Sequence, residues 1–214
     1  MFDIVASFIQ AALDTVLPRK ERVARIDSYS LADLPISPRV HEACGMDITT
    51  LLEYKNAATQ DLVKALKYDR AGNAATLLAA ALEEYLREEI ANMRLFSKKP
   101  AILMPIPLHT SRLRERGFNQ IEKVLRQLPL EFSSGEISHI DTTSLIRIRA
   151  TPQQTRLSRD ERLRNLADAF ALTTDPGNAH VILIDDVTTT GATLTAAAKP
   201  LSGKHVTLLA LAHA

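Results

Sequence analysis

Residues 181–194 read VILIDDVTTTGATL and contain the clearest pattern in the chain. The segment starts with a continuous apolar run at residues 181–184, which is typical of a central strand in a parallel sheet. Two acids follow the run, then small hydroxylic residues around Gly191, and a helix is expected over residues 193–201. This order predicts a ligand site, because open α/β sheets bind ligands beyond the carboxyl ends of their strands.

The polar loop in this segment combines two kinds of ligand chemistry. Free N–H groups at a loop and a helix start favour an anion, and threonine hydroxyls add donors. Carboxylates repel a phosphate, so Asp185 and Asp186 are expected to face sugar hydroxyls or a Mg²⁺ carried by the ligand. The phosphate is then expected along the residues that follow: Val187, Thr188, Thr189, Thr190, Gly191, Ala192 and Thr193.

A simple helix cap or one of the common nucleotide loops would account for less of this segment. A helix N-cap needs only one acid or threonine. The phosphate loop GxxxxGK[ST] and the dinucleotide fingerprint GxGxxG do not occur in the sequence. A combined sugar and phosphate site therefore fits the segment best.

The remainder of the chain alternates between apolar runs and helical patterns. Strands are expected at residues 101–108, 143–149, 169–172, 181–184 and 206–211, and helices at 2–16, 56–68, 74–93, 121–128 and 193–201. The alternation predicts an α/β fold with a central parallel sheet flanked by helices. Residues 19–47 show no clear pattern and are expected to form an irregular extension or linker. We divide the chain into an N-terminal helix and extension, 1–48, and one domain, 49–214.

Composition limits the partners. Apolar residues make up 46% of the chain and charged residues 24%, as in ordinary globular proteins. A net charge of +1 gives no support to direct binding of nucleic acid or of an anionic membrane. No apolar stretch approaches the length of a membrane span, and no targeting signal is visible.

The number of cysteines limits disulfide and zinc binding. Cys44 is the only cysteine, so no intramolecular disulfide can form, which fits a cytoplasmic protein. His41 lies three residues before it, and one Cys with one His cannot fill a tetrahedral zinc site. We therefore expect no structural zinc.

Several segments resemble a known family. VILIDDVTTTGATL is similar to the signature with which type I phosphoribosyltransferases bind phosphoribosyl pyrophosphate (PRPP). KALKYDRAGNAA (64–75), MPIPLHTSRLRERGFNQ (104–120) and RIRATPQQTRLSRDERLRNLADAF (147–170) resemble the ComF/GntX, or competence protein F-like, family. The resemblance covers the chain from residue 51 onward. It implies a type I phosphoribosyltransferase fold with a flexible lid loop and an enzyme that transfers a phosphoribosyl (pentosyl) group from PRPP–Mg²⁺, releasing pyrophosphate.

The resemblance also implies roles for residues. Asp185 and Asp186 would hold the ribose hydroxyls, directly or through Mg²⁺, and residues 187–193 would cradle the 5-phosphate. Residues 109–120 are expected to form a basic loop whose arginines face pyrophosphate: Arg112, Arg114 and Arg116. The alternative for this loop is a solvated basic surface.

For two further segments the sequence does not decide between a role in ligand binding and a purely structural role. Residues 151–164 resemble the lid that closes over the site and excludes water, with Gln153, Gln154 and Arg156 as its contacts; the alternative is a helix with solvated charges. Lys67 and Tyr68, with Arg70, are expected at a helix end, where basic residues interact with the helix dipole. A contact between these residues and the substrate is the alternative.

Two functions remain at this point. The first is a phosphoribosyltransferase with an unnamed nitrogenous base as acceptor. The second is a non-catalytic protein that binds PRPP, another ribose 5-phosphate ligand or a nucleotide, and serves DNA uptake. The sequence also leaves a homodimer open.

Overall fold

The computed structural model describes residues 19–69, 72–150, 166 and 168–214. The helix expected at 2–16 and the lid at 151–164 lie outside these residues. So do Gln153, Gln154 and Arg156, the expected lid contacts, together with Arg70.

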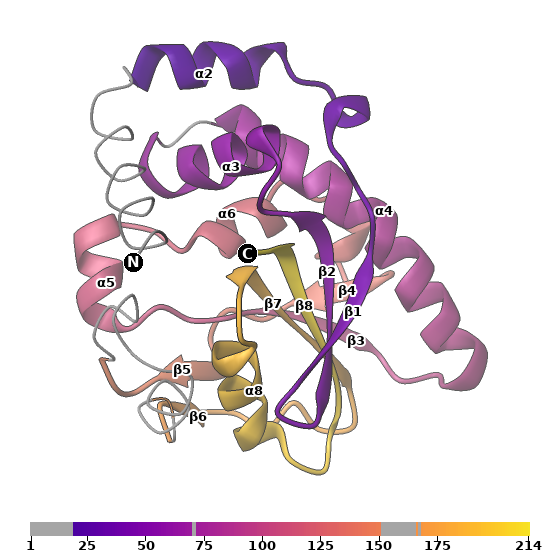
Figure 1. The fold of residues 1–214 in the computed structure, drawn as a ribbon. Coiled ribbons are helices and arrows are strands. Elements are labelled where there is room, and N and C mark those ends of the chain that lie inside the picture. Colours follow the sequence, from indigo (N-terminus) through magenta and orange to yellow (C-terminus); the bar gives the residue numbers. More distant parts are fainter. Residues whose placement is uncertain (1–18, 70–71, 151–165, 167) are drawn as a thin grey trace.

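A six-stranded sheet forms the centre of the fold, in the order β1-β2-β8-β7-β3-β4 (Figure 1). Its strands are β1 (Arg39–Ala43), β2 (Met46–Glu53), β3 (Ala101–Pro105), β4 (Ser138–Ile140), β7 (His180–Thr188) and β8 (His205–His213). All neighbouring strands are parallel except β1 and β2. The apolar run at residues 181–184 is fully buried in β7, between β8 and β3, as its composition predicts.

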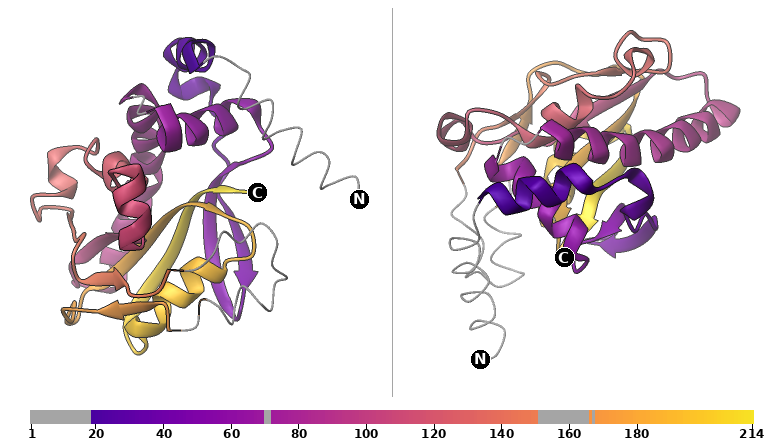
Figure 2. Two further views of the ribbon diagram at one scale, coloured as in Figure 1. Left: turned by 90° about the vertical axis from the view of Figure 1, so that its left-hand side faces the viewer. Right: turned by 90° about the horizontal axis from the view of Figure 1, so that it is seen from above.

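Helices cover both faces of the sheet. One face carries α2 (Arg19–Ser28), α3 (Ala57–Lys64), α4 (Gly72–Phe96) and α6 (Gln120–Leu125), and the other carries α8 (Ala192–Ala198) with the small sheet of β5 (Leu145–Arg147) and β6 (Phe170–Leu172) (Figures 1 and 2). Alternate β7 side chains serve the two cores: Ile182 packs in the first and Leu183 in the second. The predicted α/β fold with a central parallel sheet flanked by helices is confirmed.

The region expected to be irregular contains regular structure. After α2 and a 3-10 turn (Leu31–Asp33), β1 and β2 form a hairpin whose turn holds Cys44 and Gly45 at φ of 54° and 73°. The hairpin joins the main sheet, because β2 pairs with β8. β2 therefore runs across the expected division between residues 48 and 49.

Residues 109–120 differ from the sequence prediction. In place of a basic loop the structure has helix α5 (Thr110–Arg116). The His109 Nδ1 atom caps it by accepting the Ser111 N–H at 3.2 Å, and Gly117, at φ 84°, ends it. None of the described helices combines the length and apolar content needed to cross a bilayer.

Candidate ligand-binding site

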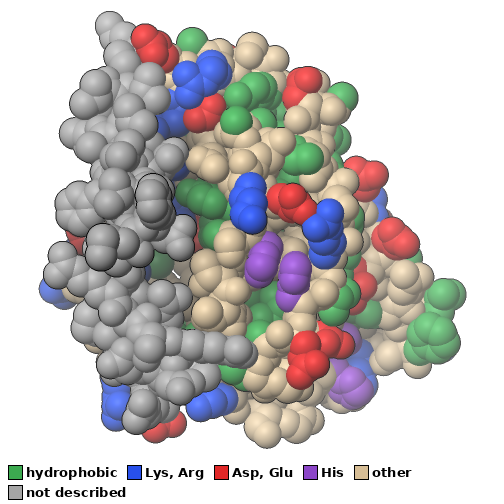
Figure 3. Space-filling model, in the orientation of Figure 1, with side chains coloured by type: hydrophobic (Ala, Val, Ile, Leu, Met, Phe, Trp, Pro, Cys, Tyr) green, Lys and Arg blue, Asp and Glu red, His purple; other side chains and the backbone are tan. Residues whose placement is uncertain are grey.

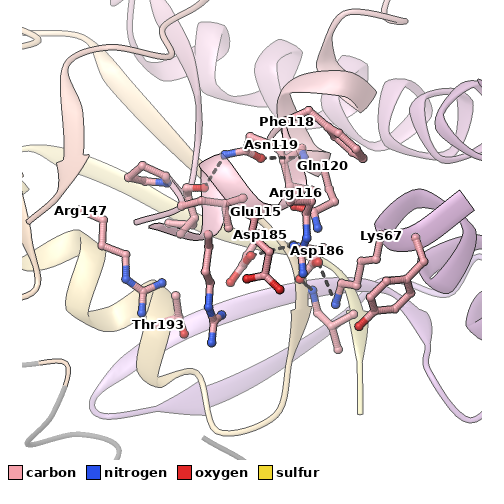
Figure 4. Close-up of a pocket in the computed structure, with 17 residues that line it drawn as sticks. Lys67, Glu115, Arg116, Phe118, Asn119, Gln120, Arg147, Asp185, Asp186 and Thr193 are labelled. Carbon is pink, nitrogen blue, oxygen red and sulfur yellow. Dashed lines mark hydrogen bonds and ion pairs between the residues drawn. The ribbon is translucent and has the colours of Figure 1, made fainter. Parts of the chain in front are cut away.

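A cavity of about 720 Å³ opens at the carboxyl ends of β3 and β7 (Figure 4). Its floor is formed by the segment after β3 (Ile106, Pro107 and Leu108) and by the end of β7. α5, the start of α6, β5 and the turn after α3 supply its walls. This is the edge of the sheet at which the sequence places the ligand.

The two acids lie inside this cavity. Asp185 is half-buried, and its Oδ1 atom accepts the N–H of Asp186 at 2.9 Å. Asp186 Oδ1 in turn accepts the N–H of Val187 at 2.7 Å. Each carboxylate is thus oriented by the backbone of the next residue, which holds both side chains at the end of the strand.

Lys67 provides a positive charge for the acids. It lies on a π-helical turn (Ala65–Asp69) that continues α3, and π turns are frequent at functional sites. Its Nζ atom is 2.9 Å from Asp186 Oδ2 (Figure 4). Burial alone would lower the pKa of Lys67, but the charge of Asp186 outweighs it, so the pKa is raised and the ammonium stays charged. Lys67 lies in the last turn of this helix, as expected from the sequence, and it also pairs with an acid of the cavity.

Asp185 has an unusual proton affinity. Burial and then the charge of Asp186 raise its pKa to about 7, although the Asp186 N–H, Lys67 and Arg147 act in the opposite direction. A carboxyl group with this pKa exchanges its proton near neutral pH, which is a feature of functional sites.

Three arginines of the described part of the chain line the cavity, and two of these were expected there from the sequence. Arg112 and Arg116 are four residues apart and share one face of α5, whereas Arg114 is exposed and does not line the cavity. The third is Arg147, whose guanidinium lies 5.3 Å from the centre of the Phe170 ring. Burial and the charge of Arg112 lower its pKa, while Asp185 raises it. The one sequence signal for Arg147 was its place at the start of a family-like segment.

The threonine loop is divided between two cavities. Val187 and Thr193 line the main cavity, whereas residues 188–191 line a second one of about 310 Å³. Thr188 Oγ1 accepts the Gly191 N–H at 3.1 Å and closes the loop, and Gly191 has φ 72°. Ala192 is buried at the start of α8.

Histidines from two strands border the smaller cavity. The rings of His41 and His213 stack with centroids 4.0 Å apart, and His41 Nε2 is 3.0 Å from Thr50 Oγ1. Burial, His213 and Arg39 lower the pKa of His41. On the surface drawn in Figure 3, histidines lie among acidic and basic side chains rather than in a patch of one charge.

Within the described residues, no group of three or more His, Cys, Asp or Glu side chains could hold a metal.

Comparisons with known proteins identify relatives. No protein-family model matches the chain. The DNA utilization protein YhgH of Salmonella typhimurium (strain LT2) is 35% identical over 135 residues, 62% of this chain and 56% of that protein. Competence protein F of Haemophilus influenzae is 34% identical over 107 residues, 49% of this chain and 45% of that protein. The chain is a relative of competence protein F.

This relationship confirms the resemblance to the competence protein F-like family inferred from the sequence motifs. The YhgH protein of Escherichia coli (strain K12) is 33% identical over 135 residues, 62% of this chain and 56% of that protein. The chain spans about half the length of these relatives. A hypoxanthine phosphoribosyltransferase structure from Staphylococcus aureus has a TM-score of 0.33 and 15% identity over 64% of this chain and 61% of that one, a likeness too slight to carry an argument.

Among the described residues, the structure brings together six of the twelve that were expected at the site. One cavity is lined by the expected residues Asp185, Asp186, Val187, Thr193, Arg112 and Arg116. Lys67 and Arg147 line the same cavity. Arg114 and residues 188–192 do not line that cavity. The site combines a carboxylate pair with guanidinium groups, which suits a ligand carrying both sugar hydroxyls and phosphates.

Proposed function

We propose that this protein binds PRPP with Mg²⁺ and transfers its phosphoribosyl group to a nitrogenous base, releasing pyrophosphate, as a type I phosphoribosyltransferase. One observation carries the proposal. The paired carboxylates at the end of β7 share a cavity with three arginines that come from two separate elements, α5 and β5.

The acid pair suits the ribose and the metal. Mg²⁺ prefers oxygen ligands and is commonly held by one or two carboxylates together with substrate phosphates and water. Asp185 and Asp186 supply such carboxylates, and when bound the ion would neutralise charge on the departing pyrophosphate. Lys67 already contacts Asp186, so this side chain would hold Asp186 in place beside the sugar.

The arginines suit the pyrophosphate. Guanidinium groups pair with phosphate oxygens through two parallel hydrogen bonds, and such charge-assisted bonds strengthen as the leaving group gains charge. Arg112, Arg116 and Arg147 take this role, and Arg114 does not, because it is exposed outside the cavity. We assign the 5-phosphate to Val187 and Thr193, the two residues of the loop at 187–193 that line this cavity. Gln153, Gln154 and Arg156 of the expected lid would cover the site.

The reaction requires no side chain to act as a nucleophile. The bond from the ribose carbon to pyrophosphate breaks, and its electron pair leaves with the pyrophosphate. The base nitrogen forms the new bond to that carbon and loses its proton to the pyrophosphate or to water. The protein's part is to hold the donor, to stabilise the leaving group and to keep water out. We place the activity in the cytoplasm, since the only thiol, Cys44, is exposed and free.

A second function is favoured by the names of the relatives. Competence protein F and the DNA utilization proteins point to a role in DNA uptake, in which the pocket would bind PRPP or a nucleotide without catalysis. The experiment is a pyrophosphate-release assay with PRPP, Mg²⁺ and a panel of nitrogenous bases. Release that depends on one base supports transfer. Binding of PRPP without release by any base supports the accessory role.

A further inference from the structure

The side-chain amides of Asn119 and Gln120, at the start of α6, differ in their hydrogen bonding. Asn119 is buried, and its Nδ2 atom donates to the carbonyl oxygen of Ile106 at 2.9 Å. Its Oδ1 atom accepts the N–H of Ile121 at 2.9 Å and that of Glu122 at 3.4 Å, which caps α6. Both polar atoms of the Asn119 amide are thus engaged: Nδ2 ties α6 to the segment after β3, and Oδ1 caps the helix.

The next amide has an unused donor. Gln120 is only 2% exposed, and its Nε2 atom has no hydrogen-bond partner among the residues that the structure describes. The residue nevertheless lines the main cavity. A buried amide donor without a partner is costly and uncommon in native proteins, so it calls for a physical reason. A hydrogen-bond acceptor on a ligand in the cavity supplies one, once the side-chain amide turns its buried Nε2 atom toward the cavity.

Aromatic side chains accompany Gln120. Phe118 and Tyr68 line the same cavity, and Tyr68 is 67% exposed, so part of its surface is open to a ligand. Figure 4 shows Phe118, Asn119 and Gln120 on one side of the acid pair, with Arg147 and Thr193 on the other. A neutral amide beside aromatic rings suits a flat heterocycle better than a phosphate, whose charge the arginines match.

We propose that Gln120, with Phe118 and Tyr68, forms the acceptor subsite and takes a planar nitrogen heterocycle. Gln120 Nε2 donates to a carbonyl oxygen or ring nitrogen at the edge of the heterocycle, and an aromatic ring packs on its face. Amides read the edges of bases and aromatic rings stack on them in many proteins. This subsite rests on the proposed function, since it presupposes a ribose between it and the phosphate groups.

The test compares ligands that differ only in the base. Ribose 5-phosphate, inosine 5′-monophosphate and uridine 5′-monophosphate are titrated calorimetrically into the wild type and into Gln120→Met, which keeps the volume but removes the amide. The wild type should bind at least one nucleotide about tenfold more tightly than ribose 5-phosphate. Gln120→Met should keep its affinity for ribose 5-phosphate within about twofold and lose most of the gain from the base.

Three results would overturn the subsite: an unchanged gain in Gln120→Met, an equal loss for ribose 5-phosphate and the nucleotides, or no gain from either base in the wild type. A parallel titration with PRPP and Mg²⁺ separates this inference from the proposed function. If the wild type binds PRPP and any of the three results is seen, only the subsite fails. If the wild type does not bind PRPP, both fail.

A stability measurement excludes a purely structural role for Gln120. Gln120→Met should melt at the same temperature as the wild type or higher, because it removes an unpaired buried donor. Asn119→Ala is the matched control and should melt at a lower temperature, because it removes three hydrogen bonds. A loss in Gln120→Met as large as that in Asn119→Ala would contradict the proposal.

Discussion

At the scale of single residues, the protonation state of Asp185 should determine how ligand affinity depends on pH. Its carboxyl group lies among the side chains of the cavity beside Asp186, and burial followed by that neighbouring charge raises its pKa to about 7. A sugar–metal ligand prefers the ionised carboxylate. Ligand binding therefore releases a proton below this pKa, and affinity should rise with pH until the group is ionised in the free protein.

We predict that the affinity for PRPP–Mg²⁺ rises by up to about tenfold per pH unit as the pH approaches about 7, and then levels off. Isothermal titration across this range measures it. Asp185→Asn is the control for the ligand's own protonation, and its remaining affinity should lose the part of the pH dependence that is due to Asp185. Identical pH profiles in the two proteins would contradict the prediction.

The charge of Lys67 should set the pH at which the affinity for PRPP–Mg²⁺ levels off. Its charge lowers the pKa of Asp185 and pairs with Asp186 at 2.9 Å. Lys67→Met should therefore move the midpoint of the binding profile to higher pH. Lys67→Arg keeps the charge and should move it less. A midpoint that stays in place in Lys67→Met would show that the ion pair does not influence Asp185.

These residues show where sequence reasoning stops. Asp185 and Asp186 could be found because strand, acids and turn residues are contiguous in the chain. The sequence left a substrate contact of Lys67 as an alternative and gave Arg147 and Gln120 no role, although all three lie in segments that resemble the family. Tertiary packing brings them together at the cavity.

At the scale of elements, helix α5 stands where a basic loop was expected, and the helix decides which arginines face the cavity. The basic run at residues 111–116 has only one apolar residue, Leu113, and its cap is His109 rather than the usual Ser, Thr, Asp or Asn. A loop was therefore expected, in which neighbouring arginines are equivalent. A helix separates them, so that Arg112 lines the cavity and Arg114 is exposed.

Arg112→Ala should weaken binding of inorganic pyrophosphate with Mg²⁺ by about tenfold or more, because it removes a charge-assisted contact. Arg114→Ala removes the same charge from the same helix and should change the affinity by less than about twofold. Isothermal titration with pyrophosphate measures both. Equal losses would mean that net charge, and not the geometry of α5, determines binding.

Gly191 is the point at which the threonine loop meets the β1–β2 hairpin. Its φ is 72°, and a Cβ atom there would lie 2.4 Å from Ala43 Cβ and 2.5 Å from Ile48 Cδ1. Gly191→Ala should lower the free energy of unfolding by about 2–4 kcal/mol through backbone strain and overpacking.

Gly203 provides the control, because its φ is 81° but a Cβ atom would meet nothing within 4 Å. Gly203→Ala should cost only the strain, about 1 kcal/mol. Denaturant unfolding of both variants gives the comparison. A loss in Gly191→Ala no larger than in Gly203→Ala would mean that the hairpin yields to the extra methyl group.

At the scale of the whole molecule, the central strands could be predicted and the edge could not. The strands β3, β7 and β8 are apolar runs, because parallel strands are buried on both faces. β1 is mostly exposed, and β2 carries two threonines between its buried residues, one of them, Thr50, within hydrogen-bonding distance of His41. Such strands are defined by their partners, so neither β1 nor β2 was among the strands expected from the sequence.

We propose that the acid pair at the end of β7 binds PRPP. Isothermal titration of PRPP with Mg²⁺ into the wild type and into Asp185→Asn/Asp186→Asn tests it most directly, with thermal unfolding to show that the variant is folded. We predict saturable binding by the wild type and none by the folded variant. Equal affinity in the two proteins, or no binding by a folded wild type, would contradict the claim.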